Sequence, residues 1–223
     1  MSGHQLLDYR PPLDVGLDLL WADDHVVIVN KPSGLLSVPG RGEAFADCMS
    51  ARVQRRYPDA LIVHRLDMDT SGLLLFARGK DMQRQFSELF LKRQVDKRYV
   101  AVLDGLLAEP SGMVDLPLIT DWPNRPLQKV DHEIGKPSQT RYQVIALDEA
   151  TGTTRVELEP ITGRSHQLRV HMLAIGHVIL GDPLYAQGQA RTRSGRLLLH
   201  AAQLQLTHPV TGESLDISCP VPF

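Results

Sequence analysis

The sequence has few of the features that mark secreted, membrane-bound or metal-dependent proteins. Its two cysteines, Cys48 and Cys219, are too few and too far apart for a disulfide framework or a zinc site. No apolar run approaches the roughly 20 residues that a membrane-spanning helix requires. Residues 1–16 lack the basic and apolar regions of a secretory signal. We therefore expect a cytoplasmic protein with no membrane partner.

Several familiar chemistries also lack their motifs. The chain contains no GxSxG nucleophile elbow, no Walker loop and no GxGxxG dinucleotide motif. His166 and His171 are five positions apart, with no glutamate between them as in HExxH, so we expect core or surface histidines and no metal. These absences favour a reaction without a cofactor, but they do not identify the reaction.

The charge of the chain is close to balanced, with 24 basic and 26 acidic residues and a net charge of −2. This sum argues weakly against a nucleic-acid partner, but the charges are unevenly distributed. Residues 47–98 carry 11 Lys and Arg against 7 Asp and Glu, whereas residues 1–46 carry 3 against 6 and residues 99–150 carry 4 against 8. A basic stretch within an acidic chain suits contact with phosphates, although a solvated helix face has the same composition.

The hydrophobic pattern predicts an α+β fold. Strands are predicted at residues 26–30, 61–63, 73–78, 99–105 and 112–118, and β-hairpins within residues 140–161 and 204–218. Helical spacing is present in residues 42–58, 81–94 and 165–176, the last with Ser165 as N-cap and Gly176 as its end. The hairpins predict a mixed, largely antiparallel β-sheet with a few flanking helices. We expect an N-terminal arm over residues 1–20 and one domain over residues 21–223.

Three segments contain residues that could carry chemistry. His64-Arg65-Leu66-Asp67 follows a short apolar strand, where a rigid scaffold can hold a catalytic side chain, although Asp in a loop is more often a turn residue. Arg169 lies among apolar residues and needs an anionic partner if it is buried, and an Asp–Arg pair would keep the carboxylate ionised. Tyr99 opens a strand behind basic residues; it could pack, or it could stack on a base.

Five sequence blocks stand out along the chain: NKPSGLLSVPG, HRLDMDTSGLLLFAR, KRYVA, PITGRSHQLRVH and ILGDPLY. Together they resemble the RluA-type family of RNA pseudouridine synthases, and they occur in that family's order over nearly the whole chain from Trp21. Residues 115–142 are similar to the subgroup that modifies a tRNA anticodon-loop uridine (position 32) and a 23S rRNA hairpin uridine (position 746). The resemblance implies the catalytic domain of that family, with a catalytic cleft across the sheet and without an N-terminal S4 domain.

The resemblance also implies roles for individual residues. Asp67 corresponds to the catalytic carboxylate, Arg169 to its salt-bridge partner, and Tyr99 to the residue that stacks on the base and transfers a proton. Arg65 would take the place of the flipped uridine, with His64 as local support or as a contact to displaced nucleotides. The remaining expected RNA contacts are Arg52, Arg55, Arg56, Lys92, Arg93, Arg164 and His166. For the first five of these, a merely solvated cation is an equally good interpretation.

The expected partner is RNA, in tRNA and 23S rRNA stem-loops, with no DNA and no cofactor, and a monomer is the default oligomeric state. A non-catalytic RNA-binding protein on the same scaffold is the alternative; it would be favoured by loss of the aspartate, the tyrosine or the arginine. A hydrolase built on Asp67 and Asp69 is a third interpretation. The sequence leaves open whether Asp67 attacks the ribose or the uracil ring, and loop residues Arg191, Arg193 and Arg196 could have shifted the target preference.

Overall fold

The computed structural model describes residues 9–223, so residues 1–8 of the predicted arm lie outside the described part. Its strands are β1 (Leu19–Ala22), β2 (Val26–Lys31), β3 (Ala60–Ile62), β4 (Ser71–Arg78), β5 (Val95–Asp104), β6 (Ser111–Asp115), β7 (Leu118–Thr120), β8 (Gln128–Val130), β9 (Gln139–Asp148), β10 (Thr153–Pro160), β11 (Leu199–Thr207) and β12 (Ser214–Ser218). Its helices are α1 (Met49–Arg56), α2 (Gly79–Leu91), α3 (Gln167–Ala174) and α4 (Gly188–Thr192), with 3-10 turns η1 (Glu43–Phe45) and η2 (Trp122–Asn124).

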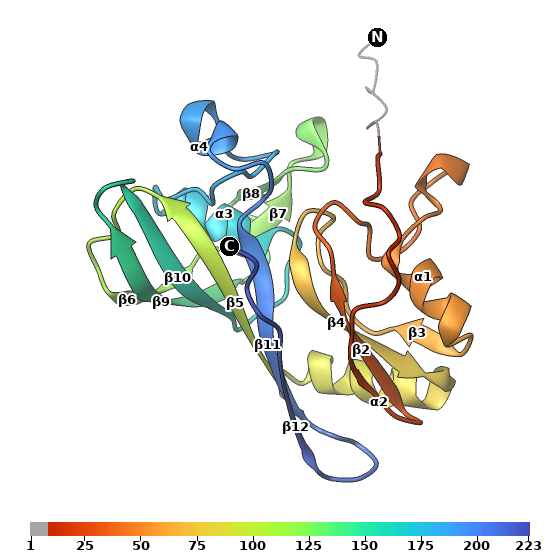
Figure 1. Cartoon of the computed structure of the whole chain (residues 1–223). Coiled ribbons are helices and arrows are strands. Elements are labelled where there is room, and N and C mark those ends of the chain that lie inside the picture. The colour runs from red at the N-terminus through yellow and green to blue at the C-terminus, as the bar shows by residue number, and fades with distance from the viewer. Residues whose placement is uncertain (1–8) are drawn as a thin grey trace.

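One sheet of 10 strands runs through the molecule in the order β1-β2-β4-β11-β5-β10-β9-β6, with β3 added to β4 and β12 added to β11. Its neighbouring strands pair antiparallel except β4 and β11, which pair in parallel through Ser71 and Gly72. Strands β7 and β8 form a separate hairpin. Figure 1 shows the two halves of the sheet on either side of β11, with α1 and α2 beside one half and α3 beside the other. The predicted α+β class with a mixed, largely antiparallel sheet is confirmed.

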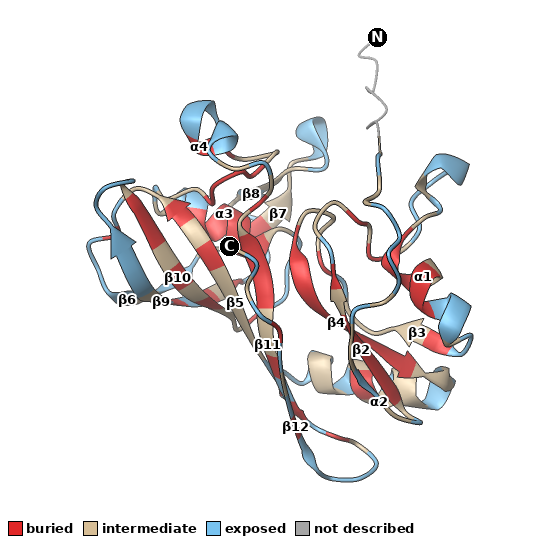
Figure 2. Cartoon of the chain, viewed as in Figure 1, coloured by how far each residue is buried: buried red, intermediate tan, exposed pale blue. Residues whose placement is uncertain are grey.

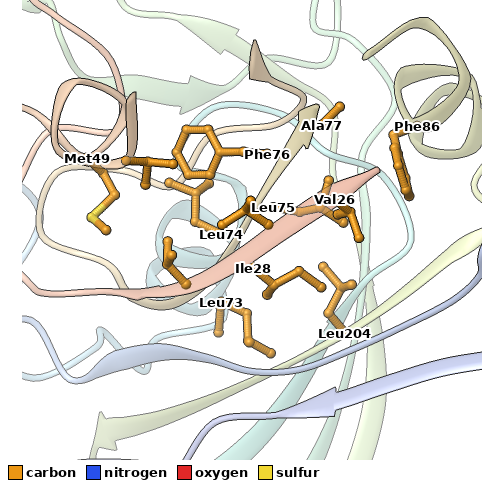
Figure 3. Packing of buried hydrophobic residues seen from close by; sticks show 14 of the residues in the cluster. Val26, Ile28, Met49, Leu73, Leu74, Leu75, Phe76, Ala77, Phe86 and Leu204 are labelled. Carbon is orange, nitrogen blue, oxygen red and sulfur yellow. The ribbon is translucent and has the colours of Figure 1, made fainter. Parts of the chain in front are cut away.

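Each half of the sheet has its own hydrophobic core. Strands β2 and β4 are buried along almost their whole length, as the red segments in Figure 2 show. Phe76, Ile28 and Leu74 are fully buried there, and Phe86 of α2 packs into the same cluster (Figure 3). Burying one such side chain contributes about 1.5–3 kcal/mol, so this core is a large part of the stability of the first half.

The second core lies between β5, β10 and α3 and includes Leu103, Leu158 and Met172. Tyr99 of β5 packs against both clusters, which places its side chain between the two halves. A residue in this position can contact groups that approach from either half.

Gly72 fixes the junction between the halves. It has φ +109°, and a Cβ at this position would lie 2.3 Å from the backbone oxygen of Ala201. Only glycine tolerates both this backbone conformation and this approach of β11. The junction therefore brings the loop of residues 63–70, which directly precedes β4, to the line where the halves meet.

Two predicted helices begin later than expected. The helix predicted from residue 42 starts at Met49, because the Cys48 thiol caps it by accepting from the Ala51 N–H at 3.5 Å. The helix predicted from Ser165 starts at Gln167, with His166 as N-cap in the left-handed conformation at φ 54°. The Ser165 cap is therefore wrong, whereas the predicted end at Gly176, with φ +88°, and both predicted hairpins agree with the structure.

Candidate functional site

The 63–70 loop is held mainly through its backbone. Ser37 Oγ donates to the Leu66 oxygen at 2.6 Å and accepts from the Leu66 N–H at 3.1 Å. The fully buried Lys31 donates from Nζ to the Met68 oxygen at 2.9 Å. These bonds fix the loop and leave the side chain of Asp67 27% exposed and available to a ligand.

Asp67 contacts a buried guanidinium from the other half of the molecule. Arg169 Nη1 on α3 donates to Asp67 Oδ2 at 3.1 Å, so the expected Asp67–Arg169 pair is present. Arg169 also donates two bonds of 2.7 Å to Asp182, a bidentate pair with side chains only 2% and 0% exposed. Such a pair is strong and directional because both partners are desolvated and their planar groups match.

The charges around Arg169 keep it cationic. Burial alone works against its charged form, but the hydrogen bonds and charges of Asp182 and Asp67 raise its pKa above the usual value. A permanent positive charge therefore lies against Asp67 Oδ2. This contact lies at the point where the two halves of the sheet meet.

A second group approaches the same carboxylate oxygen. His166 Nε2 lies 4.0 Å from Asp67 Oδ2, and His166 Nδ1 is 2.8 Å from the hydroxyl of Tyr185. That hydroxyl accepts from the Gln128 N–H at 2.8 Å, and the Tyr185 ring lies under the Arg169 guanidinium, 5.1 Å from its carbon. Burial lowers the pKa of His166, and the charge of Asp67 acts against this shift. His166, expected as an RNA contact, is thus also a neighbour of Asp67.

Tyr99 is partly exposed as a whole, but its hydroxyl has no hydrogen-bond partner among residues 9–223. Burial raises the pKa of Tyr99, and the nearby carboxylate of Asp67 raises it further. The phenol therefore stays protonated at neutral pH. The structure brings Asp67, Tyr99 and Arg169 into one neighbourhood.

The two residues before Leu66 behave differently. His64 stacks on Phe90 with ring centroids 4.5 Å apart, and its Nε2 accepts from the Leu75 N–H at 3.1 Å. Burial lowers the pKa of His64 to about 3, so the ring is neutral and acts as a local support. Its alternative role as a contact to displaced nucleotides stays a prediction. Arg65 is exposed and makes no hydrogen bond or ion pair within the described residues.

The expected phosphate contacts differ in their availability. Arg52 is only 5% exposed and donates to Asp47 at 2.7 and 2.9 Å and to the Pro12 oxygen at 2.6 Å, so its prediction as an RNA contact is wrong. Arg55 pairs with Asp14, and Lys92 pairs with Glu88 at 2.7 Å, but both remain exposed. Arg56, Arg93 and Arg164 are also exposed. These five cations remain predictions.

Asp182 and Tyr185 were not identified as site residues from the sequence, and Asp69 was considered only as part of the hydrolase interpretation. Asp182 follows the apolar residues Ile179 and Leu180 within the ILGDPLY block. An acid in such a segment needs a cationic partner when it is buried, so pairing it with the isolated Arg169 could have found it. Tyr185 carried no comparable signal, because its contacts with Gln128 and His166 join residues that are distant in the chain.

No group of three or more His, Cys, Asp and Glu side chains within residues 9–223 is arranged to hold a metal ion. In the same part of the chain, every helix is too short or too polar to cross a membrane. His171 is fully buried, with Nδ1 2.8 Å from Thr140 Oγ1 and Nε2 3.0 Å from the Leu116 oxygen. It is a satisfied core histidine, as expected.

Comparison with known proteins agrees with this geometry. Residues 25–174 match the family model described as RNA pseudouridylate synthase. The chain is 54% identical over 216 residues to the dual-specificity RNA pseudouridine synthase RluA of Escherichia coli K12, covering 97% of this chain and 98% of that protein. The RluA of Vibrio vulnificus is also 54% identical, over 219 residues, 96% of this chain and 88% of the relative.

Solved structures give the same result. The human RNA pseudouridylate synthase domain containing 1 has a TM-score of 0.79 at 29% identity, covering 96% of this chain and 87% of that chain. The human domain containing 4 has a TM-score of 0.73 at 28% identity, covering 92% and 88%. This chain belongs to the RNA pseudouridylate synthase family and is an isomerase that converts uridine in RNA to pseudouridine.

Proposed function

We propose that the protein isomerises uridine 32 of tRNA anticodon loops and uridine 746 of a 23S rRNA hairpin, with Asp67 as its catalytic carboxylate. The observation that carries the role of Asp67 is its contact with Arg169 at 3.1 Å, because this pair joins the two halves of the molecule and leaves the carboxylate partly exposed. The word dual-specificity in the names of the 54% identical relatives supports two kinds of RNA target.

The reaction needs a carboxylate but no redox group. The C–N bond between uracil and ribose breaks, the uracil turns, and a C–C bond forms between C5 of the base and C1′ of the ribose. C5 loses a proton and N1 gains one, so atoms and electrons balance without a nucleotide, flavin or metal. Asp67, which accepts a hydrogen bond from Arg169, acts on this centre as nucleophile or as stabiliser of the positive charge on the sugar.

Tyr99 and Arg65 are proposed to handle the base. The phenol ring of Tyr99, between the two halves, stacks on the uracil that has left the RNA loop. Because its pKa is raised, the Tyr99 hydroxyl keeps its proton and acts as a hydrogen-bond donor more readily than as a base. Arg65, two residues before Asp67 and without partners among residues 9–223, inserts where the uridine was.

The exposed cations Arg55, Arg56, Lys92, Arg93 and Arg164 are proposed to contact RNA phosphates, which position the RNA without reading its sequence. We take the working unit to be a monomer, because one chain supplies every side chain that meets at Asp67. The buried free thiols of Cys48 and Cys219 suit a reducing cytoplasm.

Incubation with RNA tests the proposal. The purified protein, without added cofactor, is mixed with a tRNA anticodon stem-loop, with the 23S hairpin, and with each RNA carrying cytidine at the target position. Pseudouridine is then mapped by mass spectrometry. Pseudouridine at position 32 and at position 746 supports the proposal. Unchanged RNA that is still bound supports the non-catalytic alternative, and cleaved RNA supports the hydrolase.

A further inference from the structure

A cavity of about 240 Å³ lies beside the 63–70 loop, on the side of the N-terminal residues. Its lining includes Tyr9, Gly34, Leu36, Phe45, Met68 and Asp69. A cavity of roughly 150 Å³ already admits a benzene ring, so this one has room for a larger planar ring. We refer to it as the Asp69 cavity.

The aromatic part of its lining is held firmly. Tyr9 and Phe45 stack with ring centroids 5.5 Å apart and planes 14° from parallel. The Tyr9 hydroxyl donates to the Asp47 oxygen at 2.8 Å and accepts from the Leu36 N–H at 3.1 Å. Aromatic faces that are fixed before binding are suited to stacking on a planar base, because little side-chain entropy is lost.

Asp69 supplies a hydrogen-bonding group without a partner. Its carboxyl makes no hydrogen bond and no ion pair within residues 9–223, although the side chain is partly buried. Arg10 lines the same cavity, and it forms no hydrogen bond or ion pair with Asp69. The other two nearby cations are engaged elsewhere. Lys31 donates to the oxygens of Pro32, Leu35 and Met68, and Arg169 donates to the other two carboxylates.

The surroundings of Asp69 disfavour the ionised form of its carboxyl group. Burial raises the pKa of its carboxyl; the charges of Arg169 and Lys31 act against this shift, and those of Asp182 and Asp67 add to it. The Asp69 oxygens are not among the fully buried polar atoms without a partner in residues 9–223, so they can be reached by a donor group of a ligand.

We propose that the Asp69 cavity binds a second unpaired base of the substrate RNA, one with an exocyclic amino group that donates to the Asp69 carboxylate. An ionised carboxylate only accepts hydrogen bonds, so it can accept from the exocyclic amino groups of adenine, cytosine or guanine but cannot pair with a base carbonyl oxygen. The inference rests on the proposed function, since extrusion of the target uridine unstacks its neighbours close to Asp67. Asp69 is thus a specificity residue and takes no part in the bond changes.

A double-mutant cycle, in which the protein and the RNA are each changed at one position, tests the inference through binding affinity. The probes are anticodon-type stem-loops in which one loop base at a time lacks its amino group, with purine for adenine, inosine for guanosine and 2-pyrimidinone for cytosine. Dissociation constants are measured by fluorescence anisotropy for the wild type, Asp69→Ala and the control Asp24→Ala, which removes a carboxylate that is 98% exposed.

At one loop position, loss of the amino group should weaken binding to the wild type and to Asp24→Ala by about 10- to 100-fold, as expected for a hydrogen bond to a charged group. Asp69→Ala should bind both versions of that RNA equally. The inference is overturned if no position depends on its amino group, or if the dependence persists in Asp69→Ala.

Stability provides a second readout. Asp69→Asn keeps the shape of the side chain and removes the unpaired charge, so its melting temperature should equal or exceed that of the wild type. A lower melting temperature would assign Asp69 a structural role and overturn the inference. The cycle measures binding, so its failure is distinct from failure of the proposed function, which appears as wild-type protein that forms no pseudouridine.

Discussion

Arg169 donates a 3.1 Å hydrogen bond to Asp67, a residue 102 positions earlier in the chain. The same guanidinium is anchored by two 2.7 Å bonds to the fully buried Asp182. Asp182 therefore fixes the cation, and the cation fixes the orientation of Asp67. Of these three residues, only Asp67 is exposed enough to contact a substrate. Substitution of Arg169 or Asp182 should therefore affect stability, whereas substitution of Asp67 should affect activity.

Replacing Arg169 by alanine should destabilise the fold by about 3–5 kcal/mol, because Asp182 would be left buried without a cation. Asp67→Asn should change the free energy of unfolding by less than about 1 kcal/mol, since the side chain is partly exposed and loses one bond. Urea unfolding measures both. Lys92→Ala is the matched control, because Lys92 pairs with Glu88 at the surface at 2.7 Å and should cost about 1 kcal/mol or less. Equal losses for Arg169→Ala and Lys92→Ala would contradict the anchoring role of Asp182.

Arg65→Ala should reduce base flipping without affecting stability. The side chain is exposed and has no partners within residues 9–223, so the melting temperature should stay that of the wild type. A fluorescent base analogue at the target position reports unstacking, and its signal on binding should fall. Arg84→Ala, which removes an exposed cation on α2, serves as the control for lost charge. A normal signal with Arg65→Ala would show that Arg65 does not insert into the RNA.

The motifs predicted which residues gather at the site, but not what holds them there. Asp67, Tyr99 and Arg169 lie in blocks whose order could be read from the sequence. The anchoring by Asp182 and the burial of Arg52 could not, because both depend on segments that meet only in three dimensions. Arg52 and Arg56 lie four residues apart on α1, yet Arg52 is bonded to Pro12 and Asp47 after the chain before β1 folds over α1. Alternating and helical patterns predicted the elements well, whereas helix starts depended on the local caps at Cys48 and His166.

Arg52 and Arg56 should therefore separate stability from RNA binding. Arg52→Ala loses its bonds to Asp47 and Pro12 and should cost about 1–3 kcal/mol of stability, with an unchanged salt dependence of RNA affinity. Arg56→Ala should leave stability within about 0.5 kcal/mol and, if Arg56 contacts a phosphate, reduce the slope of log affinity against log salt by about one. A reduced slope for Arg52→Ala would contradict the assignment of Arg52 to the fold.

His64 should make stability depend on pH between about 3 and 6.5. Burial lowers its pKa from 6.5 to about 3, so in this range the unfolded chain binds a proton that the folded protein does not. The stability that neutral His64 contributes is thus fully present above pH 6.5 and is lost as the pH falls towards 3. In His64→Gln the slope of unfolding free energy against pH should be smaller by up to one proton, about 1.4 kcal/mol per pH unit. Parallel wild-type and variant curves would show that His64 is not held neutral.

The most direct test of the account is the rate of pseudouridine formation by Asp67→Asn, measured on a stem-loop RNA that the wild type converts. The substitution keeps the size of the side chain and removes the negative charge that faces Arg169. We predict no detectable isomerisation, with RNA affinity within about tenfold of wild type, because contacts to phosphates dominate binding. Pseudouridine formed by Asp67→Asn at a rate near that of the wild type would contradict the central role of this carboxylate.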